Sequence, residues 1–457
     1  MHCSRRAANG TLHSCVNQAD VVMMSMNSRY QLVLQHFVFA IFAVSLWGTV
    51  ANVVPISVAF ALLLPFVPVG LANNPRFPHF VVALLALYIY FAASTALYAP
   101  VSFISPDFYR RDGNFFPTWS PVILGALFPL AVDVENVIKP FLTWATICDA
   151  VFIIVYLKTG GTIVVHEAGI YHMLFIAHNA AGGFLGMVVC FQIGFIIRER
   201  AGLTSVLSLA VNLLGLILTK SRGSEFGVLM AVIVVVVLNE RFLKTIISGV
   251  VVSTAVLLSF TYPAWRDMGE PPTLWLDHGA PFLKVKGAII NFTLLDRVMF
   301  LWPRAIYLFL KSPIFGTGFG SYNDLPYRLS GIPHIFMYNR PITLYFNSAH
   351  AHNTFLHVLA ETGIVGLTLL LVMLYRLRGF ILEIKNPGIS KALLMGFWYA
   401  VFSSLTEHRL VTPAEMLPFT LITGMVVASS NARGVLMSRR SLESGNAEAS
   451  VAGKIGM

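Results

Sequence analysis

Long, uninterrupted apolar segments constrain this chain more than any other feature. Residues 228–238, for example, carry apolar side chains only. Such runs suit helices that cross a lipid bilayer, where every backbone group must find its partner within the segment. A transmembrane β-barrel would instead alternate polar and apolar residues. Composition agrees, because 56% of the residues are apolar and 11% are charged, whereas soluble domains carry about 25% charged residues.

Hydropathy predicts an all-α polytopic membrane protein with about twelve transmembrane helices and one large outer loop that contains short helices. The first nine helices fall within 31–262, the loop covers 263–354, and the last three helices fall within 355–430. The individual helices are expected near 31–52, 53–72, 80–101, 117–134, 137–157, 180–197, 202–219, 225–239, 242–262, 355–376, 391–410 and 412–430.

Basic residues predict the orientation of these helices. Arg5, Arg6 and Arg29 precede the first helix, so the leader, residues 1–30, is expected in the cytoplasm by the positive-inside rule. The leader lacks the apolar core of a cleavable signal peptide. An even number of helices returns the C-terminus to the same side, and the small polar residues of 431–457 predict a disordered cytoplasmic tail.

The sequence gives no support for binding nucleic acid, a metal ion or a cofactor. The net charge of +10 is in part this ordinary positive-inside bias, so it does not indicate nucleic acid. None of the four cysteines lies in the large outer loop, and no CxxC motif or His/Cys cluster suggests zinc. The acidic residues of the loop are scattered rather than paired, so we expect no bound metal and no cofactor.

The outer loop carries more cations than anions, against the positive-inside trend. The eight cations are Arg266, Lys284, Lys286, Arg297, Arg304, Lys311, Arg328 and Arg340, and the five anions are Asp267, Glu270, Asp277, Asp296 and Asp324. A loop this long is usually functional. One interpretation is a solvated loop with incidental charge, and the other is a site for an anionic substrate at the outer face.

A short interfacial helix is predicted inside this loop. The segment from Asp296 through Trp302 to Lys311 is mostly apolar, and Trp302 suits the headgroup region. Proline is tolerated in the first helical turn, so the helix is expected to begin near Pro303. The glycines of 316–320 then permit a tight turn and close approach of a ligand or backbone.

An outer arginine occurs earlier, in Ser221-Arg222-Gly223, between the seventh and eighth predicted helices. Lys220 and Arg222 could simply extend toward the interface. Alternatively, Arg222 could point inward at the same anion, because the planar guanidinium gives bidentate hydrogen bonds to phosphate groups.

Two histidines and an asparagine mark the point where the outer loop meets the tenth predicted helix. His350, His352 and Asn353 lie at this boundary, where polar groups are costly unless they have a role. Gly363 and Gly366 follow on one face of the helix and would let another helix approach closely. For His357 we expect simple interfacial polarity.

Together these motifs resemble the family of O-antigen ligases and O-antigen polymerases. The ligase pattern has His, then Asn, Ser or Gln, then nine residues and Gly-x-x-Gly, which reads here from His352-Asn353 to Gly363-Ile364-Val365-Gly366. Ser221-Arg222-Gly223 is similar to the short outer turn of the family. The stretch from Arg297 through Trp302 and Pro313 to Gly316-Thr317-Gly318 is similar to its Arg, Trp, Pro-x-x-Gly-x-Gly segment.

The resemblance implies a GT-C-like glycosyltransferase of the bacterial inner membrane with its active site facing the periplasm. The donor would be a glycan on undecaprenyl pyrophosphate, and the acceptor a sugar hydroxyl of the lipid A core or of another glycan. His352 would be the general base, and Arg222 and Arg297 would bind pyrophosphate. Further substrate contacts would come from Asn353, His350, Arg304 and Lys311.

Other functions remain open at this stage. A polymerase of the same family shares the motifs. A transporter of lipid-linked sugars would place ionisable groups in mid-membrane and usually shows internal repeats, whereas the charges singled out above gather at the outer face. A non-catalytic scaffold for envelope assembly is the remaining alternative.

Overall fold

The structure is a computed structural model, and it describes part of the chain. The described residues are 77–98, 100–109, 111–127, 133–160, 170–173, 175, 177–198, 202–240, 243–267, 297–323, 336–337, 340–341 and 350–431. The predicted leader, the first two predicted helices, the tail after 431 and much of the outer loop lie outside these residues. Predictions about them remain predictions.

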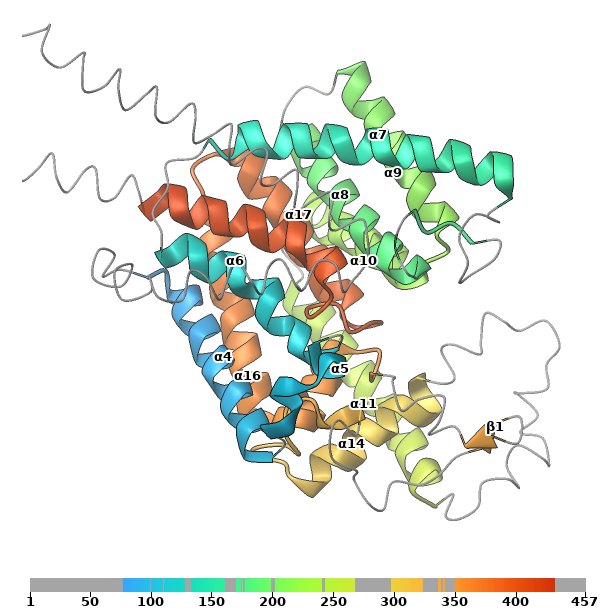
Figure 1. Cartoon of the computed structure of the whole chain (residues 1–457), viewed down its shortest axis with the longest axis vertical. Helices are drawn as coiled ribbons and strands as arrows, with labels where there is room; N and C mark the ends of the chain where they lie inside the picture. The colour runs from blue at the N-terminus through green and yellow to red at the C-terminus, as the bar shows by residue number, and fades with distance from the viewer. Residues whose placement is uncertain are drawn as a thin grey trace, which may run out of the picture.

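Helices make up nearly all of the described secondary structure (Figure 1). The α-helices are α4 (His79–Tyr98), α5 (Pro106–Tyr109), α6 (Phe115–Leu127), α7 (Glu135–Thr159), α8 (His178–Arg198), α9 (Leu203–Leu218), α10 (Arg222–Val232), α11 (Leu243–Asp267), α14 (Trp302–Lys311), α16 (Thr354–Leu382), α17 (Pro387–Ser403) and a last helix at 413–431. Single turns are η2 (Pro100–Ile104), η3 (Asp112–Asn114), η4 (Ile233–Val237), η5 (Arg297–Leu301) and η6 (Ser321–Asn323), of which η4 and η5 are π-helical. Two-residue strands, β1 (Phe336–Met337) and β2 (Arg340–Pro341), form an antiparallel ladder.

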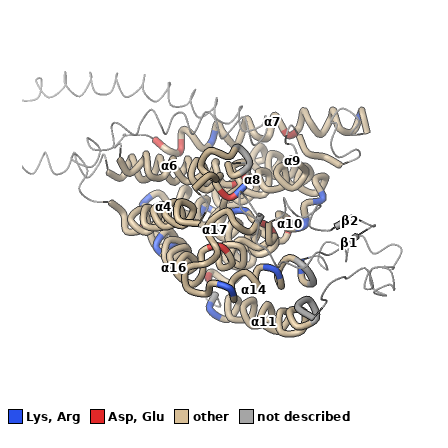
Figure 2. Tube along the Cα trace, turned by 60° about the horizontal axis from the view of Figure 1, so that its bottom comes forward, with Lys and Arg blue, Asp and Glu red and all other residues tan. Residues whose placement is uncertain are grey.

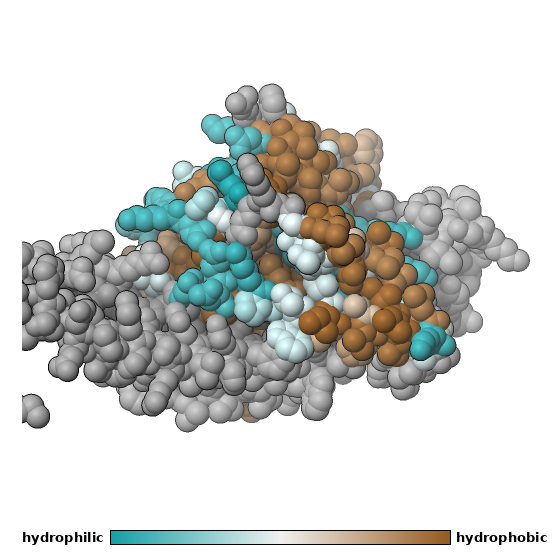
Figure 3. Space-filling model, turned by 90° about the horizontal axis from the view of Figure 1, so that it is seen from above, coloured by the Kyte–Doolittle hydropathy of each residue, from teal (hydrophilic) through white to brown (hydrophobic). Residues whose placement is uncertain are grey.

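Every predicted transmembrane segment from 80–101 onward coincides with a helix. Five described helices, α4, α7, α8, α11 and α16, are long and apolar enough to cross a membrane. Charged residues are sparse along them (Figure 2), and apolar side chains cover much of the described surface seen from above (Figure 3). The chain is therefore an α-helical, multi-pass membrane protein.

Sequence signals fix several helix ends. Asn386 caps α17, because its Oδ1 accepts hydrogen bonds from the amides of Gly388 and Ile389 at 2.9 and 3.1 Å. Pro303 stands in the first turn of α14, as predicted from its sequence. Helix α17 ends at Ser403 rather than near 410, which corrects the predicted boundary. A helix continued through the Glu407-His408-Arg409 run would have carried these polar groups into the membrane.

Helix α16 is broken at Gly363, whose φ of 62° and ψ of −163° are not helical. The break frees backbone groups that the membrane cannot satisfy. The loop that follows α14 satisfies them. The amides of Ile364 and Val365 donate to the carbonyls of Pro313 and Ile314, respectively, and the Gly318 amide donates to the Glu361 backbone carbonyl. The two glycine motifs therefore pack against each other, and Gly363 admits a loop rather than the helix expected from the sequence.

The same loop is anchored to α4, which lies beside α16 (Figure 1). Thr95 Oγ1 donates to the Phe319 carbonyl at 3.0 Å, and the Phe319 amide donates to Ser94 Oγ at 3.1 Å. The Phe319 ring stacks on Phe91, with centroids 4.1 Å apart. This packing places the end of α14 and the start of α16 at one end of the bundle.

Small residues bring the remaining helices together around α8. A Cβ atom at Gly194 would lie 2.4 Å from the Ala392 Cα in α17, so the two backbones are in contact. A Cβ atom at Gly186 would meet the Tyr399 ring at 2.5 Å. Helix α17 is thereby held in the core, and the turn that follows it, residues 404–412, reaches the same end of the bundle as His352.

Candidate functional site

Glu407 lies at the centre of the candidate site and gathers three residues singled out from the sequence. Its Oε1 accepts a hydrogen bond from Arg297 Nη2 at 2.6 Å, and its Oε2 lies 2.6 Å from His352 Nδ1. His350 Nε2 lies 3.6 Å from the same Oε2. We call Glu407, Arg297, His352 and His350 the Glu407 cluster. Its glutamate is buried, whereas its histidines are partly exposed, so a substrate can reach them.

The charge state of Glu407 sets the tautomer of His352. Burial alone would raise the pKa of Glu407, but the attraction of His352, hydrogen bonds from both histidines and the charge of Arg409 hold it well below the usual range. An ionised carboxylate only accepts hydrogen bonds, so His352 Nδ1 is the donor. The lone pair of neutral His352 is then on Nε2, the nitrogen that a base uses.

Local backbone structure positions His352 at the start of α16. Its φ of 48° is left-handed, which is uncommon for a residue with a side chain. Immediately after it, Asn353 caps the helix, because its Oδ1 accepts hydrogen bonds from the amides of Phe355 and Leu356 at 3.0 and 3.1 Å. Thr354 donates its amide to the Ser404 carbonyl at 2.8 Å, and its hydroxyl donates to the Glu407 carbonyl at 3.2 Å. The start of α16 is thus bonded to the turn that carries Glu407.

Arg222 begins α10, and the first turn of this helix packs against the Glu407 turn. A Cβ atom at Gly223 would lie 2.6 Å from Thr406 Oγ1 and 3.3 Å from Glu407 Cγ. The Arg222 side chain is exposed. The backbone of the Ser221-Arg222-Gly223 motif therefore adjoins the Glu407 cluster, as a shared anion site would require.

The buried side chain of Arg409 forms hydrogen bonds with the serines that flank Arg222. Its Nη1 lies 3.0 Å from Glu415 Oε2, and the same nitrogen donates to the Asn179 carbonyl at 2.8 Å. Its Nη2 donates to Ser224 Oγ at 3.1 Å and to Ser221 Oγ at 3.4 Å. Because its guanidinium is enclosed by protein groups, Arg409 joins α10 to the Glu407 turn rather than facing a substrate.

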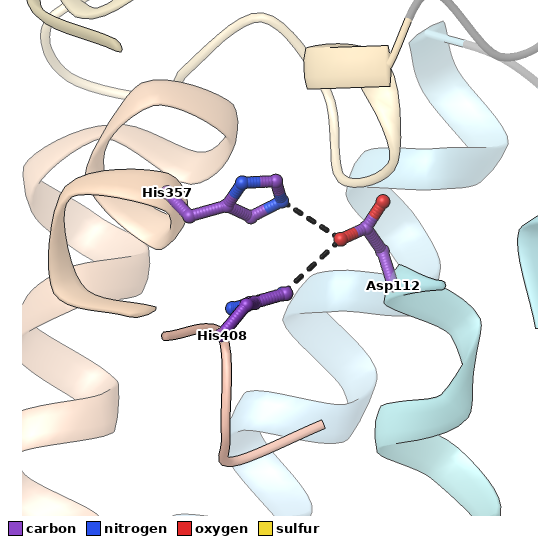
Figure 4. A group of neighbouring side chains, drawn as sticks. All are labelled: Asp112, His357 and His408. Atoms are coloured by element: carbon purple, nitrogen blue, oxygen red, sulfur yellow. Dashed lines mark hydrogen bonds and ion pairs between the residues drawn. The ribbon is translucent and has the colours of Figure 1, made fainter. Parts of the chain in front are cut away.

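A second, fully buried cluster lies next to the first and consists of Asp112, His357, His408 and Glu361; we call it the Asp112 cluster. Asp112 Oδ1 lies 2.7 Å from His357 Nε2 and 3.2 Å from His408 Nε2 (Figure 4). Glu361 Oε1 lies 3.4 Å from the same His357 nitrogen and accepts the Tyr322 amide at 2.8 Å. His357 is therefore a bonded core residue, and the expectation of simple interfacial polarity was wrong.

Four histidine rings connect the two clusters. Ring centroids lie 4.3 Å apart for His350 and His352, 5.5 Å for His350 and His408, and 4.1 Å for His357 and His408. Burial lowers the pKa of His408 to about 3 and, with repulsion from His352, lowers that of His350 to about 4. Both rings are neutral at neutral pH.

Arg304 and Lys311, the other predicted substrate contacts, lie on α14. Arg304 is buried, donates from Nη2 to the Tyr322 carbonyl at 2.9 Å, and stacks on the Tyr322 ring at 4.9 Å. Lys311 is exposed at the end of the helix, with Nζ 4.8 Å from the centroid of the Tyr307 ring. Both residues lie outside the hydrogen bonds described above for the Glu407 cluster, and their role in binding substrate remains a prediction.

Among the residues that the structure describes, two groups of side chains have metal-ligand chemistry: Asp112 with His357 and His408, and Glu407 with His350 and His352. In the first group, His357 Nδ1 accepts the Ala351 amide at 3.3 Å, so the ring proton is on Nε2 and no lone pair faces Asp112. In the second group, the guanidinium of Arg297 already neutralises Glu407. Each arrangement fits a hydrogen-bonded network better than a metal site.

Glu407 and Asp112 were not among the residues predicted from the sequence. Glu407-His408-Arg409 is a polar run at the outer end of the predicted helix 391–410, and such a run inside an apolar segment is a detectable signal. Asp112 carries only a weak signal, as an acidic residue that follows Arg110 and Arg111 in the sequence.

Comparison with known proteins agrees with the motifs. The family model for O-antigen ligase matches residues 203–371, a segment that includes Arg222, Arg297 and His352 and ends before Glu407. No curated protein matches the chain. The match indicates an O-antigen ligase-like domain in residues 203–371, which supports an O-antigen ligase-like family for the chain.

Proposed function

We propose that the protein is an O-antigen ligase of the bacterial inner membrane. It transfers an O-antigen-type glycan from undecaprenyl pyrophosphate to a sugar hydroxyl of the lipid A core, on the periplasmic side. One observation carries the proposal: the two oxygens of Glu407 hold Arg297 and His352, a cation and a base, each at 2.6 Å. A reaction that deprotonates an alcohol while a pyrophosphate leaves needs these two groups side by side.

In the proposed reaction, His352 Nε2 takes the proton of the acceptor hydroxyl as its oxygen attacks the anomeric carbon of the donor sugar. The bond between that carbon and the pyrophosphate oxygen breaks, and undecaprenyl pyrophosphate leaves with the bonding electron pair. Arg297 and Arg222 stabilise the negative charge that develops on the leaving group. The proton on His352 is released to solvent, because a quarter of its side chain is exposed.

Glu407 supports both halves of this reaction. Through Oε2 it keeps the proton of His352 on Nδ1 and stabilises the imidazolium that forms, which is the role of the acid in hydrolase triads. Through Oε1 it orients the Arg297 guanidinium and leaves further N–H donors for phosphate oxygens. Because one carboxylate holds both groups, the distance between base and anion site is fixed before substrate binds.

The other predicted residues take supporting roles in the proposal. Neutral, half-buried His350 contacts the acceptor. Asn353 acts through the helix cap that follows His352 rather than by touching substrate. Lys311, exposed on α14, attracts the anionic substrates, and Arg304 shapes the loop through Tyr322. The proposed chemistry is metal-independent, because a base and fixed cations supply proton transfer and charge stabilisation.

A polymerase of the same family is the second candidate, because the motifs are shared and the acceptor is then another lipid-linked glycan. A transporter of lipid-linked sugars is less well supported, since the ionisable groups of the Glu407 cluster lie in turns or at the start of a helical segment rather than in mid-helix.

Complementation tests the proposal and separates the candidates. Wild type and His352→Ala are expressed in one strain lacking its ligase and one lacking its polymerase, and lipopolysaccharide is analysed by electrophoresis. A ligase restores capped core in the first strain, and His352→Ala does not. Rescue of the second strain alone assigns the polymerase. Rescue by His352→Ala as complete as by wild type would refute a catalytic role for this residue.

A further inference from the structure

The amide between the two site histidines is held by a residue that the proposed reaction does not use. Ala351 is fully buried and donates its N–H to His357 Nδ1 at 3.3 Å. Since this nitrogen accepts, the ring proton of neutral His357 is on Nε2. That nitrogen lies 2.7 Å from Asp112 Oδ1, so His357 donates to the carboxylate. In this tautomer the Ala351 amide donates to His357, and His357 donates to Asp112.

Asp112 is suited to fix this ring. Its buried Oδ1 accepts hydrogen bonds from His357 Nε2 at 2.7 Å and from His408 Nε2 at 3.2 Å. The ionised carboxylate can only accept, so it imposes the Nε2–H tautomer on His357 and leaves Nδ1 open to the Ala351 amide. Figure 4 shows the first part of this path, from Asp112 in η3 to His357 in the first turn of α16. The hydrogen bond of His357 to the Ala351 amide continues it to the backbone beside His352.

This path ends at a strained backbone. A left-handed conformation at a residue other than glycine is strained and persists only where neighbouring contacts hold it. His352 has a φ of 48°. On its C-terminal side the cap of Asn353 and the Thr354 amide fix the chain. On its N-terminal side the Ala351 amide is bonded to His357.

We propose that His357 and Asp112 are positioning residues for the reaction: Asp112 sets the tautomer of His357, and His357 anchors the Ala351 amide so that His352 keeps its left-handed backbone and its contact with Glu407. The inference rests on the proposed role of His352 as base. It extends the site to a segment, residues 112–114, that lies outside the match to the O-antigen ligase family.

Two substitutions at one position separate positioning from mere stabilisation. In His357→Asn the side-chain oxygen can take the place of Nδ1 and accept the Ala351 amide, but the hydrogen bond to Asp112 is lost. In His357→Gln the amide group can take the place of Nε2 and donate to Asp112, but the Ala351 acceptor is lost. Positioning predicts the higher kcat for His357→Asn, whereas neutralisation of the buried carboxylate predicts better folding for His357→Gln.

The assay follows glycan transfer by purified protein from an undecaprenyl-pyrophosphate-linked O-antigen repeat to lipopolysaccharide that carries bare core. Misplacing a catalytic group by about 1 Å costs up to about a hundredfold. We expect the kcat of His357→Gln to fall about tenfold to a hundredfold, with KM for the donor little changed, and that of His357→Asn to fall at least several-fold less. Equal kcat values, or the reverse order, would overturn the inference.

A second pair of variants keeps the test decisive if neither histidine variant folds. Asp112→Asn keeps an oxygen that accepts from His357 and should retain most of the wild-type kcat, whereas Asp112→Leu should match the loss expected for His357→Gln. Equal kcat values for these two would also overturn the inference. Asp149→Asn is the control, because Asp149 is a buried carboxyl in α7 that is hydrogen-bonded to Tyr171, away from both clusters. His352→Ala is measured in parallel: no transfer by the wild-type protein defeats the proposed function, full activity of His352→Ala defeats the role of His352 as base, and loss there with an intact His357→Gln defeats only the inference.

Discussion

Replacing Glu407 with glutamine is the most direct test of the proposed site. The two side chains have the same shape, but glutamine has one acceptor oxygen where Glu407 uses two. Arg297 donates to Oε1 and His352 donates to Oε2, each at 2.6 Å. In Glu407→Gln the amide nitrogen must therefore face one of these donors.

Either orientation of the amide damages the site. If the nitrogen faces His352, the ring is favoured in the other tautomer, with its proton on Nε2, and it can no longer act as the base. If it faces Arg297, the guanidinium loses its anchor. The corresponding acid-to-amide change in serine proteases lowers kcat by about 10⁴, and general-base catalysis contributes about 10²–10⁴. We expect kcat to fall by about 10²–10⁴, which corresponds to about 3–5 kcal/mol of transition-state stabilisation.

The measurement is initial-rate transfer at saturating donor and acceptor, with the folded fraction checked by size-exclusion chromatography. Glu383→Gln makes the same chemical change at an exposed position after α16 and should have wild-type kcat. Glu407→Asp, which keeps two acceptor oxygens, should recover part of the activity. A kcat within threefold of wild type for Glu407→Gln would show that the carboxylate is not needed and would refute the reasoning.

Three further outcomes are expected. Gly363→Ala should destabilise the protein by about 1–3 kcal/mol or more, because φ is 62° and a Cβ atom would lie 2.4 Å from the Ile314 carbonyl oxygen; Gly379→Ala, with nothing within 4 Å, should leave the melting temperature unchanged or higher. The pKa values of Asp112 and Glu407 are lower in the folded protein than in the unfolded chain, where they are about 4, so both carboxylates stabilise the fold above that pH. The melting temperature should therefore fall as pH drops below about 4, and it should fall less steeply in Asp112→Asn. A melting temperature that does not depend on pH would contradict this. Transfer should continue in EDTA, and a loss that magnesium or manganese restores would refute metal independence.

Much of the helical framework could be predicted from the sequence, because burial in a membrane is a local property. A helix such as α8, which matches the predicted 180–197, needs only its own apolar run to be recognised. The same is true of Pro303, which marks the first turn of α14 through a purely local restriction on its backbone. Helix ends that depend on partners were harder, as the early end of α17 at Ser403 shows.

Only part of the candidate site could be predicted from the sequence, because the rest also depends on partners that are distant in the chain. His352 and Arg297 lie in motifs that can be seen in the sequence, but Glu407, which joins them, lies 55 and 110 residues away, respectively. Asp112 lies 245 residues from His357. No local pattern marks a carboxylate whose importance comes from the two donors it meets after folding. Pairings of this kind are set by the packing of α4, α16 and α17, which a single sequence does not encode in any short segment.

The break in α16 also bears on how the protein is made. The carbonyls and amides released at Gly363 find partners in residues 313–318, which precede them in the chain. A ribosome therefore delivers the loop before it delivers the broken helix. When residues 354–382 enter the bilayer, residues 313–318 are already synthesised, so the backbone groups freed at Gly363 need no substitute hydrogen-bond partner. A circular permutation that places residues 297–323 after the last helix would reverse this order. The backbone carbonyls and amides at Gly363 would then lack hydrogen-bond partners in the bilayer until residues 297–323 were synthesised.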